Sequence, residues 1–486
     1  MKTMKKAITF TLVFLMLIST TALAEETVAD TSFRVFFDGQ EITFPDEQTY
    51  VHNGKYLYIP LRAIAEATGY AVSWEDASKT AIVKKGDRIG TFTVGGKMYV
   101  NDVEKQAKVN FPLKNGRIFV SQYGICHALD CTMRWDSINS ILYFYSSEMY
   151  PLGIDFSQET FKDPVTSSEE YKDFYSLAEP AFIIPGLNEG MVPNGIAYCK
   201  NTDRFFLSYK TTATERAASI ATVDAKTGEL IGEYRILDED GSPSYAQIGG
   251  IAVSEKDIYF HPGGAKVKRI PLAAFDAAGK KGTVQVVQTL NLEIGGAKTG
   301  SYVDCSGGYL WFGNFYDADK KTYAHKALEK FPAVIRGYKL DSSSPDGIAE
   351  ECKATNSDKY EYIPNIIYTV DDTHIQGVTT TGNYMLTTTS YSTTEPGIVH
   401  VYDMTKNDSV EDILTFDENR QVPVIHLTPE KNFVTPPYLE EIAINNEQLY
   451  MNFESGAIAM RVNKGAFPTD SVWKIDVEKL VAPSSK

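Results

Sequence analysis

Two kinds of hydrophobic pattern divide the chain near its first third. In residues 33–147, short alternating apolar runs typical of strands are interrupted by short runs with helical spacing. In residues 180–486, nearly every apolar run is strand-like and is bounded by Gly or Asn turns. Residues 148–179 are acidic and aperiodic, and we predict an inter-domain linker there. The predicted fold class is mainly β, with an N-terminal α+β module followed by an all-β domain.

The N-terminal module contains a duplicated pattern. In the first copy the turn Asn53-Gly54 precedes the apolar strand Tyr56–Ile59, and Pro60 opens a helical run that ends at Gly69. Asn-Gly favours a tight hairpin turn, and proline fits the first position of a helix. Each copy is therefore predicted to be a hairpin, a short helix and a returning hairpin.

The second copy follows at an offset of 62 residues at Asn115-Gly116 and of 61 at Trp135, which corresponds to Trp74. It departs from the first copy in two places, because Ser121-Gln122-Tyr123 replaces Pro-Leu-Arg and Asp130 stands where glycine is expected. We expect Trp74 and Trp135 to be core anchors rather than platforms for a ligand.

The first copy reads as an Asn-Gly turn, an apolar strand, Pro-Leu-Arg, a helix that ends in Gly, and a Trp strand. This string resembles the copper amine oxidase N-terminal-like domain, a stalk module of secreted bacterial proteins. The resemblance implies a small α+β module without catalysis and without copper. The residues agree with it, because His52 and His127 are too few for a three-histidine copper centre.

Five units of similar form make up the C-terminal region. Each has a short apolar strand, a turn, an aromatic-rich strand and a further strand. Repeats of this size predict a β-propeller, in which each unit is one blade, so we expect five blades within a range of four to six. The last unit lacks a fourth strand, and Phe182-Ile183-Ile184 is expected to supply it and close the ring. The alternative is an open sandwich or two separate sheets.

The C-terminal region is also similar to the propeller-like domain of uncharacterised secreted bacterial proteins. The strings that carry this likeness include Pro185–Glu189, Met191–Ala197 and Gly308–Tyr316. The resemblance implies a fold and a location, and it implies no reaction.

A propeller brings the starts of its first strands and the ends of its second strands together around one axial mouth. We expect this mouth to be polar and aromatic, as small-ligand and carbohydrate sites are. Its predicted ligand-binding residues are Asn194, Tyr209, His261, Asn314, Tyr316, Gln376, Tyr391, Glu440 and Glu454. A loop with Tyr323, His325 and Lys326 is expected to form a wall or lid. The alternative is that these groups satisfy one another and line a water-filled channel.

Enzymatic alternatives depend on the axial carboxylates. Glu440 and Glu454, with Asp304 and Glu189 nearby, are candidates for a glycan hydrolase. A lactonase-like site with one divalent cation is a second alternative, and its oxygen ligands would come from Asn194, Gln376 and Glu440. Serine-hydrolase, zinc-protease and phosphate-loop motifs are absent. The first hypothesis is therefore non-enzymatic binding, without a cofactor, of a cell-wall glycan or a surface protein.

Composition and the N-terminus point outside the cytoplasm. Met1–Ala24 combines three lysines, an apolar core and a small-x-small end, which predicts a cleaved secretory signal. The remaining chain has 44 Lys and Arg against 63 Asp and Glu, so it repels phosphate backbones and nucleic-acid binding is not expected. We predict no membrane span after cleavage and a secreted, extracellular or wall-associated protein. The five cysteines are too few for a disulfide scaffold and are expected to be mostly buried.

Overall fold

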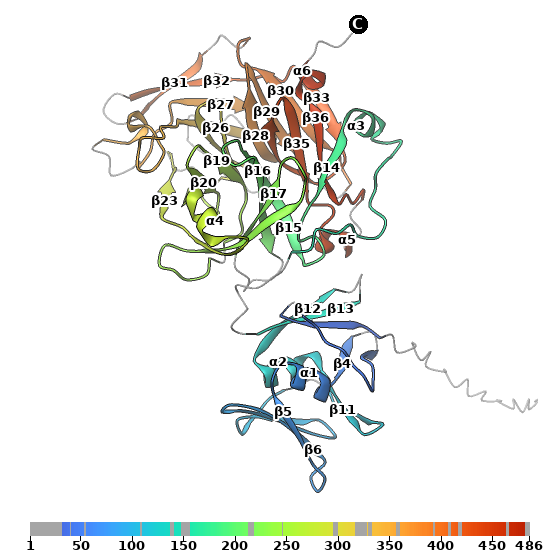
Figure 1. Cartoon of the computed structure of the whole chain (residues 1–486). Helices are drawn as coiled ribbons and strands as arrows, with labels where there is room; N and C mark the ends of the chain where they lie inside the picture. Colours follow the sequence, from blue (N-terminus) through green and yellow to red (C-terminus); the bar gives the residue numbers. More distant parts are fainter. Residues whose placement is uncertain are drawn as a thin grey trace, which may run out of the picture.

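The computed structural model shows a small N-terminal module beside a larger β domain (Figure 1). It describes residues 32–38, 40–52, 55–106, 109–136, 140–146, 156–211, 218–244, 246–294, 300–315, 328, 333–355, 360–391, 394–406, 410–416, 420–462 and 466–481. Several predicted features lie outside these residues: the signal segment, the turn at Asn53-Gly54, Tyr316, and the loop with Tyr323, His325 and Lys326.

The N-terminal module has the predicted duplication of hairpin, helix and returning hairpin. The first copy consists of β3 (Tyr50–His52), β4 (Tyr56–Pro60), α1 (Leu61–Ala67), β5 (Ala71–Glu75) and β6 (Thr80–Lys85). The second consists of β10 (Leu113–Lys114), β11 (Arg117–Ser121), α2 (Gln122–Leu129), β12 (Cys131–Asp136) and β13 (Ile141–Ser146). The other strands are β1 (Arg34–Phe37), β2 (Gln40–Glu41), β7 (Arg88–Thr93), β8 (Lys97–Val100) and β9 (Val103–Glu104). Antiparallel pairing of β4 with β11 joins the two copies.

Local chemistry explains where the two helices of the module begin and end. Pro60 lies immediately before α1, where its missing N–H costs nothing. The hydroxyl of Ser121 caps α2 by accepting a hydrogen bond from the backbone of Gly124 at 3.3 Å. Asp130, at the position where glycine was expected, ends α2 in the left-handed conformation with φ of 53°. Aspartate tolerates this conformation better than most residues, so the substitution is compatible with the repeat.

The two tryptophans of the repeat have different surroundings, and the prediction of two core anchors is wrong for Trp74. Trp135 is half-buried and packs edge-on against Phe33, with ring centroids 5.3 Å apart. Trp74 is 37% exposed. It lies on β5, which is the outermost strand of the sheet β5-β6-β7-β8-β9, so no neighbouring strand covers it on that side.

The described residues of the C-terminal region form five sheets. The first has the order β15 (Met191–Cys199), β16 (Arg204–Thr211), β17 (Ser219–Asp224), β18 (Leu230–Leu237), β22 (Lys281–Gln285). The second has β19 (Ile251–Val253), β20 (Asp257–Phe260), β21 (Lys266–Pro271), β23 (Gln288–Asn291). The third has β24 (Tyr302–Ser306), β25 (Tyr309–Gly313), β26 (Ala333–Lys339), β27 (Ile366–Val370), β32 (Arg420–His426), β31 (Val410–Phe416).

The fourth sheet has the order β28 (Ile375–Thr381), β29 (Tyr384–Thr389), β30 (Gly397–Asp403), β33 (Lys431–Thr435). The fifth has β14 (Glu179–Ile183), β36 (Ser471–Asp476), β35 (Gln448–Phe453), β34 (Leu439–Asn445). Short helices accompany the sheets: α3 (Lys172–Leu177), α4 (Leu272–Ala278), α5 (Ile458–Val462), α6 (Val477–Val481) and a 3-10 turn at Glu350–Cys352.

The first strands of the five sheets lie against one another in a ring. Their order is β15, β19, β24, β28, β34 and back to β15. The ring closes as predicted, because β14 near the start of the domain pairs antiparallel with β36 near its end, with Phe182 opposite Val472. The predicted class, mainly β with a C-terminal propeller, is confirmed.

The predicted linker is not extended along its whole length. Phe156 and Phe161 are buried in the core that the first and fifth sheets share. Phe174 of α3 packs on Trp473 of β36, with ring centroids 5.1 Å apart. The sequence did not predict these contacts, because the segment is acidic and its three aromatic side chains are too widely spaced to form a periodic pattern. Residues 156–179, the part of the segment that the structure describes, therefore pack against the propeller.

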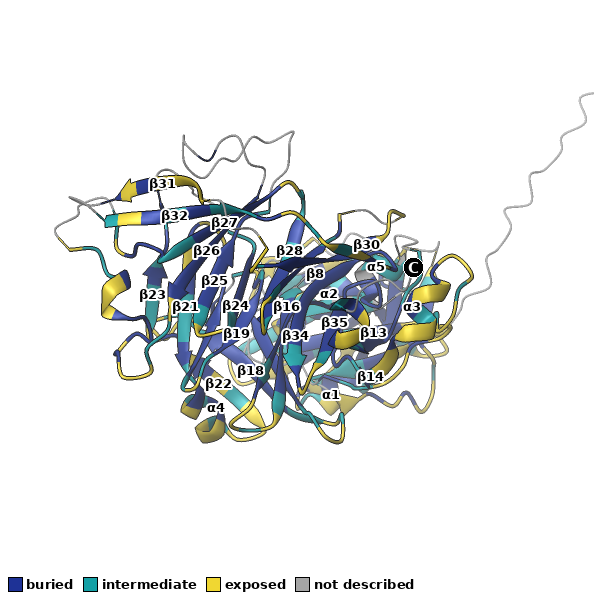
Figure 2. Cartoon of the chain, turned by 90° about the horizontal axis from the view of Figure 1, so that it is seen from above, coloured by how far each residue is buried: buried dark blue, intermediate teal, exposed yellow. Residues whose placement is uncertain are grey.

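Burial follows the sheets, and exposed residues gather in loops and on the outer helices (Figure 2). None of the helices in the described part of the chain combines the length and the hydrophobicity of a membrane span. The five cysteines are free thiols, and Cys131, Cys199 and Cys352 are buried.

Candidate functional site

Three of the five axial strands contain a bulge at the same level. The register shifts between Pro193 and Ile196 in β15, between Ile375 and Gly377 in β28, and between Leu439 and Ile442 in β34. A bulge bends a strand and redirects its side chains, and bulges are frequent beside functional sites. The bulged residues are Asn194, Gly195, Gln376, Glu440 and Glu441.

The bulges bring three of the predicted site residues together. The amide nitrogen of Asn194 donates to Oε2 of Glu440 at 2.6 Å, and that of Gln376 donates to Oε1 at 3.4 Å. Gln376 also donates to the backbone oxygen of Ser390 at 3.2 Å. Asn194 and Glu440 are buried, whereas Gln376 is partly exposed. Both oxygens of one buried carboxyl are therefore held by amides from two other sheets.

Glu454 joins this cluster and brings a positive charge with it. The ammonium of Lys210 lies 3.3 Å from its Oε2 atom, and its carboxyl interacts electrostatically with that of Glu440. Burial raises the pKa of Glu440 well above its ordinary value, and the nearby Glu454 raises it further. Burial alone would lower the pKa of Lys210, but the two carboxyls outweigh it and raise that pKa. The cluster therefore combines two carboxyl groups with one ammonium.

Glu441, which the sequence analysis missed, fills the axis next to Glu440. Its Oε2 atom accepts hydrogen bonds from the backbone nitrogens of Ile196 and Ile251, both at 3.0 Å. Burial raises its pKa well above the ordinary value. A Cβ atom on Gly195 or Gly250 would lie within 2.7 Å of its carboxyl oxygens, so only glycine fits there. Glycine at these two positions therefore leaves room for the carboxyl of Glu441.

Two polar side chains at the bulges, Asn194 and Asn452, have buried atoms without a hydrogen-bond partner in the described part of the chain. These atoms are Oδ1 of Asn194 and both amide atoms of Asn452. Asn452 lies on β35 opposite the bulge of β34, because its neighbours Phe453 and Met451 pair with Leu439 and Ile442. Buried polar atoms are nearly always satisfied in native proteins, so these positions mark a site for a hydrogen-bonding ligand or solvent.

Aromatic rings from two neighbouring sheets form a stack near Gln376. Tyr391 is 62% exposed and stacks in parallel on His374, with ring centroids 4.2 Å apart. Phe315 approaches His374 at 4.9 Å and Tyr391 at 5.7 Å. His374 has a φ of 59°, a left-handed conformation that costs free energy outside glycine and is frequent at functional sites. We call these three residues the rim stack. Of the three, only Tyr391 was predicted, although Phe315 ends an aromatic-rich strand.

Three other predicted ligand-binding residues, Tyr209, His261 and Asn314, are buried and contact other parts of the fold. Tyr209 is fully buried and packs on Phe156, with ring centroids 5.1 Å apart. The ring of His261 is bonded to the backbone oxygen of Gly264 at 3.0 Å, and burial lowers its pKa to about 4, so it is neutral at pH 7. Oδ1 of Asn314 accepts from a backbone nitrogen of β26 at 3.1 Å.

The two further carboxylates that were considered for catalysis have hydrogen-bond partners of their own. Glu189 accepts a hydrogen bond from the hydroxyl of Ser157 at 2.7 Å. Asp304 lies in the interior of β24, where burial raises its pKa to about 7 and Ser306 donates a hydrogen bond to it.

The arrangement does not fit a divalent cation. Asn194 and Gln376 present amide nitrogens to Glu440, and Lys210 supplies a positive charge beside Glu454. These groups stabilise carboxylates, whereas Ca²⁺ requires six to eight converging oxygens. No group of three His, Cys, Asp or Glu residues in the described ranges could hold a metal ion.

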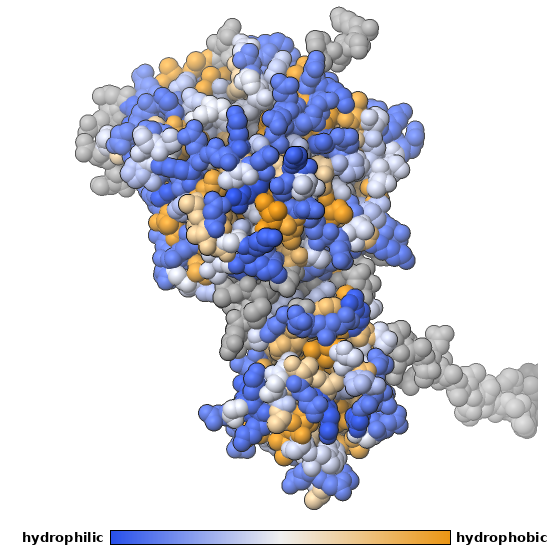
Figure 3. All heavy atoms as spheres, in the orientation of Figure 1, coloured by the Kyte–Doolittle hydropathy of each residue, from blue (hydrophilic) through white to orange (hydrophobic). Residues whose placement is uncertain are grey.

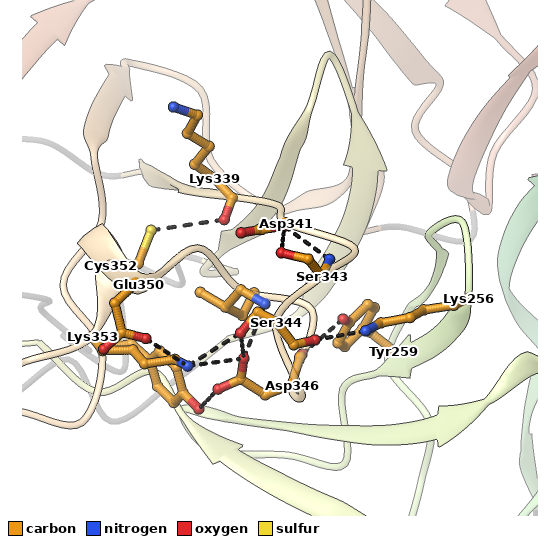
Figure 4. A network of polar contacts seen from close by, with 12 residues as sticks. Lys256, Tyr259, Lys339, Asp341, Ser343, Ser344, Asp346, Glu350, Cys352 and Lys353 are labelled. Carbon is orange, nitrogen blue, oxygen red and sulfur yellow. Dashed lines mark hydrogen bonds and ion pairs between the residues drawn. The ribbon is translucent and has the colours of Figure 1, made fainter.

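A second polar cluster lies in the loop that follows β26 (Figure 4). Asp346 accepts hydrogen bonds from Ser344 at 2.7 Å and from Tyr362 at 2.8 Å, and the ammonium of Lys353 lies 3.5 Å away. Lys256 donates to the backbone oxygen of Ser344 at 2.6 Å. The loop borders a groove of about 480 Å³ between the hairpins of the first three sheets. Because its charged groups are paired with one another, we interpret this cluster as a brace for the loop.

Comparisons with known proteins agree with the N-terminal assignment. Residues 36–144 match the family model of the copper amine oxidase N-terminal domain. No curated protein matches the chain. Among solved structures, the chain is similar to a glutaminyl cyclase of Myxococcus xanthus, with 10% identity, a TM-score of 0.31, and coverage of 62% of this chain and 92% of that chain.

Two other solved structures have similar scores. The mitotic checkpoint complex has 8% identity, a TM-score of 0.26, and coverage of 84% and 86% of the two chains. The nidogen–laminin complex has 12% identity, a TM-score of 0.26, and coverage of 57% and 84%. Scores this low carry no argument about function, and the sheet topology of this chain supports the propeller by itself.

Proposed function

We propose that the protein is a non-enzymatic binding protein whose axial mouth takes a neutral, hydroxyl-rich ligand of the carbohydrate class. The observation that carries this proposal is the buried cluster of carboxyl and amide groups at the strand bulges, in which Asn194 and Gln376 hold Glu440. Its carboxyl and amide groups match the alternating donors and acceptors of sugar hydroxyls.

The rim stack supports the same ligand class. Sugar rings present apolar C–H faces that pack on aromatic side chains, and most of the Tyr391 side chain is open to solvent. Gln376 connects the two parts, because it bonds Glu440 inside the mouth and the residue before Tyr391 at the rim. A ligand could therefore contact both the cluster and the stack.

The rest of the chain suggests where binding takes place. The signal-like N-terminus and the stalk-type module support a secreted or wall-associated protein, in which the module is a spacer or adaptor for the propeller. Its partner would be a cell-wall glycan or a glycosylated surface protein.

A thermal-shift screen of the full mature chain against neutral oligosaccharides tests this proposal. We expect at least one neutral sugar to raise the melting temperature of the wild type, and Glu440→Ala to remove the shift. Val434→Ala, on the exposed face of β33, is the control and should respond like the wild type. Release of free sugar that stops in Glu440→Gln would instead support the hydrolase alternative and overturn the proposal.

A further inference from the structure

The N-terminal module presents an aromatic side chain in an unexpected place. Trp74 is 37% exposed, and Leu113 of β10, which lines the same groove, is 43% exposed. Figure 3 shows hydrophobic surface on this module, around α1 and β5. A large indole exposed next to another apolar side chain is a common sign of a binding surface.

Comparison of the two repeats shows that the exposure of Trp74 is specific to the first copy. In the second copy, Phe33 from the N-terminal strand covers the equivalent Trp135. The first copy also has Arg62 where the second has Tyr123. The repeat can therefore bury its tryptophan, and the first copy instead leaves it beside a cation.

Trp74 and Arg62 line the same groove, which has a volume of about 290 Å³. This is close to the lower end of the roughly 300–1,000 Å³ of small-molecule pockets, so it suits a single ring. Its floor is apolar, with Leu61, Ala81 and Ile118. An aromatic wall over an apolar floor suits the flat face of a pyranose.

The charged side chains around the groove leave one cation free. Lys79 is paired with Asp76 at 2.7 Å, and Nε of Arg117 lies 3.0 Å from Asp46. Arg62 has no ion-pair or hydrogen-bond partner among the residues that the structure describes. A guanidinium presents a rigid fork of donors that matches a carboxylate. The groove thus has a free anion-binding group next to an aromatic face.

The net charge of the two domains agrees with an acidic ligand at the N-terminal module only. Residues 33–147 contain 13 Lys and Arg against 12 Asp and Glu, whereas the whole chain has a net charge of -16. Long-range repulsion of an anion is therefore weak at this module and strong at the propeller.

We propose that the groove of Trp74 and Arg62 binds an acidic sugar, a hexuronic acid unit of a polysaccharide. The pyranose ring lies on the indole of Trp74, and the sugar carboxylate accepts hydrogen bonds from the guanidinium of Arg62. A peptide fits less well, because the groove is short and has only one aromatic wall. This second site is separate from the axial mouth, so the protein has two sugar contacts of different charge preference.

Tryptophan fluorescence tests the proposal, because Trp74 is the most exposed of the four tryptophans: Trp311 and Trp473 are buried and Trp135 is half-buried. The probe is a trimer of β-linked glucuronic acid, added to the full mature chain in the presence of acrylamide. We expect the trimer to reduce acrylamide quenching in the wild type and in Trp135→Phe, and to have no effect on quenching in Trp74→Phe.

Arg62→Gln is the second variant, with Lys97→Gln on β8 as its control. We expect Arg62→Gln to weaken binding of the acidic trimer roughly tenfold, as loss of a charge-assisted pair does, and Lys97→Gln to leave it unchanged. The matching glucose trimer should bind as weakly to the wild type as the acidic trimer binds to Arg62→Gln. Absence of protection in the wild type, or equal binding of the two trimers, would overturn the proposal. Glu440→Ala should leave this signal unchanged, so failure at the axial mouth is distinguishable from failure here.

Discussion

The Oε2 atom of Glu441 lies 3.0 Å from the backbone nitrogen of Ile251, although 190 residues separate the two along the chain. The same oxygen accepts a second hydrogen bond from the backbone of Ile196. Glu441 belongs to the fifth sheet, and its two donors belong to the second and the first. One buried carboxyl at the axis therefore ties three sheets together.

Replacement of Glu441 tests this structural role. Glu441→Ala leaves two buried backbone N–H groups without an acceptor, each of which costs about 1–3 kcal/mol. Glu441→Gln keeps an acceptor oxygen for these two N–H groups, so it should cost less. Urea denaturation of both variants measures the difference. Equal stability of Glu441→Ala and the wild type would contradict the role.

Asp304 should give the protein a measurable pH dependence. Burial raises its pKa to about 7 in the folded state, against about 3.9 in an unfolded chain. The folded state then binds the additional proton, so the free energy of unfolding falls as the pH rises from about 4 to about 7. At about 1.4 kcal/mol for each pKa unit, the full change is about 4 kcal/mol.

Asp304→Asn isolates this contribution, because asparagine has nearly the shape of a protonated aspartate and does not titrate. Chemical denaturation at pH 5 and pH 8 should show a larger loss of stability in the wild type than in the variant. The same loss in both proteins would mean that Asp304 is ionised in the folded state.

Closure of the ring by β14 predicts that Phe182 stabilises the fold. This side chain is 8% exposed and packs on Phe205 of the first sheet, with ring centroids 5.3 Å apart. Phe182→Ala removes that contact at the point where the first and last sheets meet, and a buried Phe→Ala change costs about 3–5 kcal/mol. A matched change at the exposed Val287→Ala should cost little. Thermal unfolding that is unchanged in Phe182→Ala would argue against closure through this strand.

Replacement of Tyr391 should weaken ligand binding while it leaves the stability of the fold nearly unchanged. Its side chain is 62% exposed, so Tyr391→Ala should change the free energy of unfolding by about 0.5 kcal/mol or less. If the rim stack contacts the ligand, the same variant should weaken sugar binding by roughly tenfold. A titration calorimeter measures affinity, and a denaturation curve measures stability. Loss of both together would show that Tyr391 has a structural role instead.

The sequence predicts the elements of both domains because their local signals are strong. The hairpins and helices follow from Asn-Gly turns, Pro60 and alternating apolar runs. The strand that contains Phe182, which pairs with β36 at Val472, was predicted because the last unit lacks one strand. The meeting of Asn194, Gln376 and Glu440 follows from the equivalence of the repeats.

The remaining features depend on contacts that no local pattern encodes. Glu441 was missed because regular alternation points adjacent residues to opposite faces, and a bulge is required to turn both Glu440 and Glu441 inward. The exposure of Trp74 depends on tertiary contacts. Phe33 packs against Trp135 of the second copy, whereas Trp74 of the first copy is 37% exposed. Tyr209 and His261 stand at the ends of their strands, but tertiary packing buries them.

A calorimetric titration with paired variants tests whether the cluster around Glu440 recognises a neutral sugar. The full mature chain is titrated with the neutral oligosaccharide that gives the largest thermal shift, alongside Asn194→Ala and Val434→Ala. We expect Asn194→Ala to weaken binding roughly tenfold and Val434→Ala to bind like the wild type. Equal affinity of Asn194→Ala and the wild type would contradict this proposal, because the sugar would then bind elsewhere.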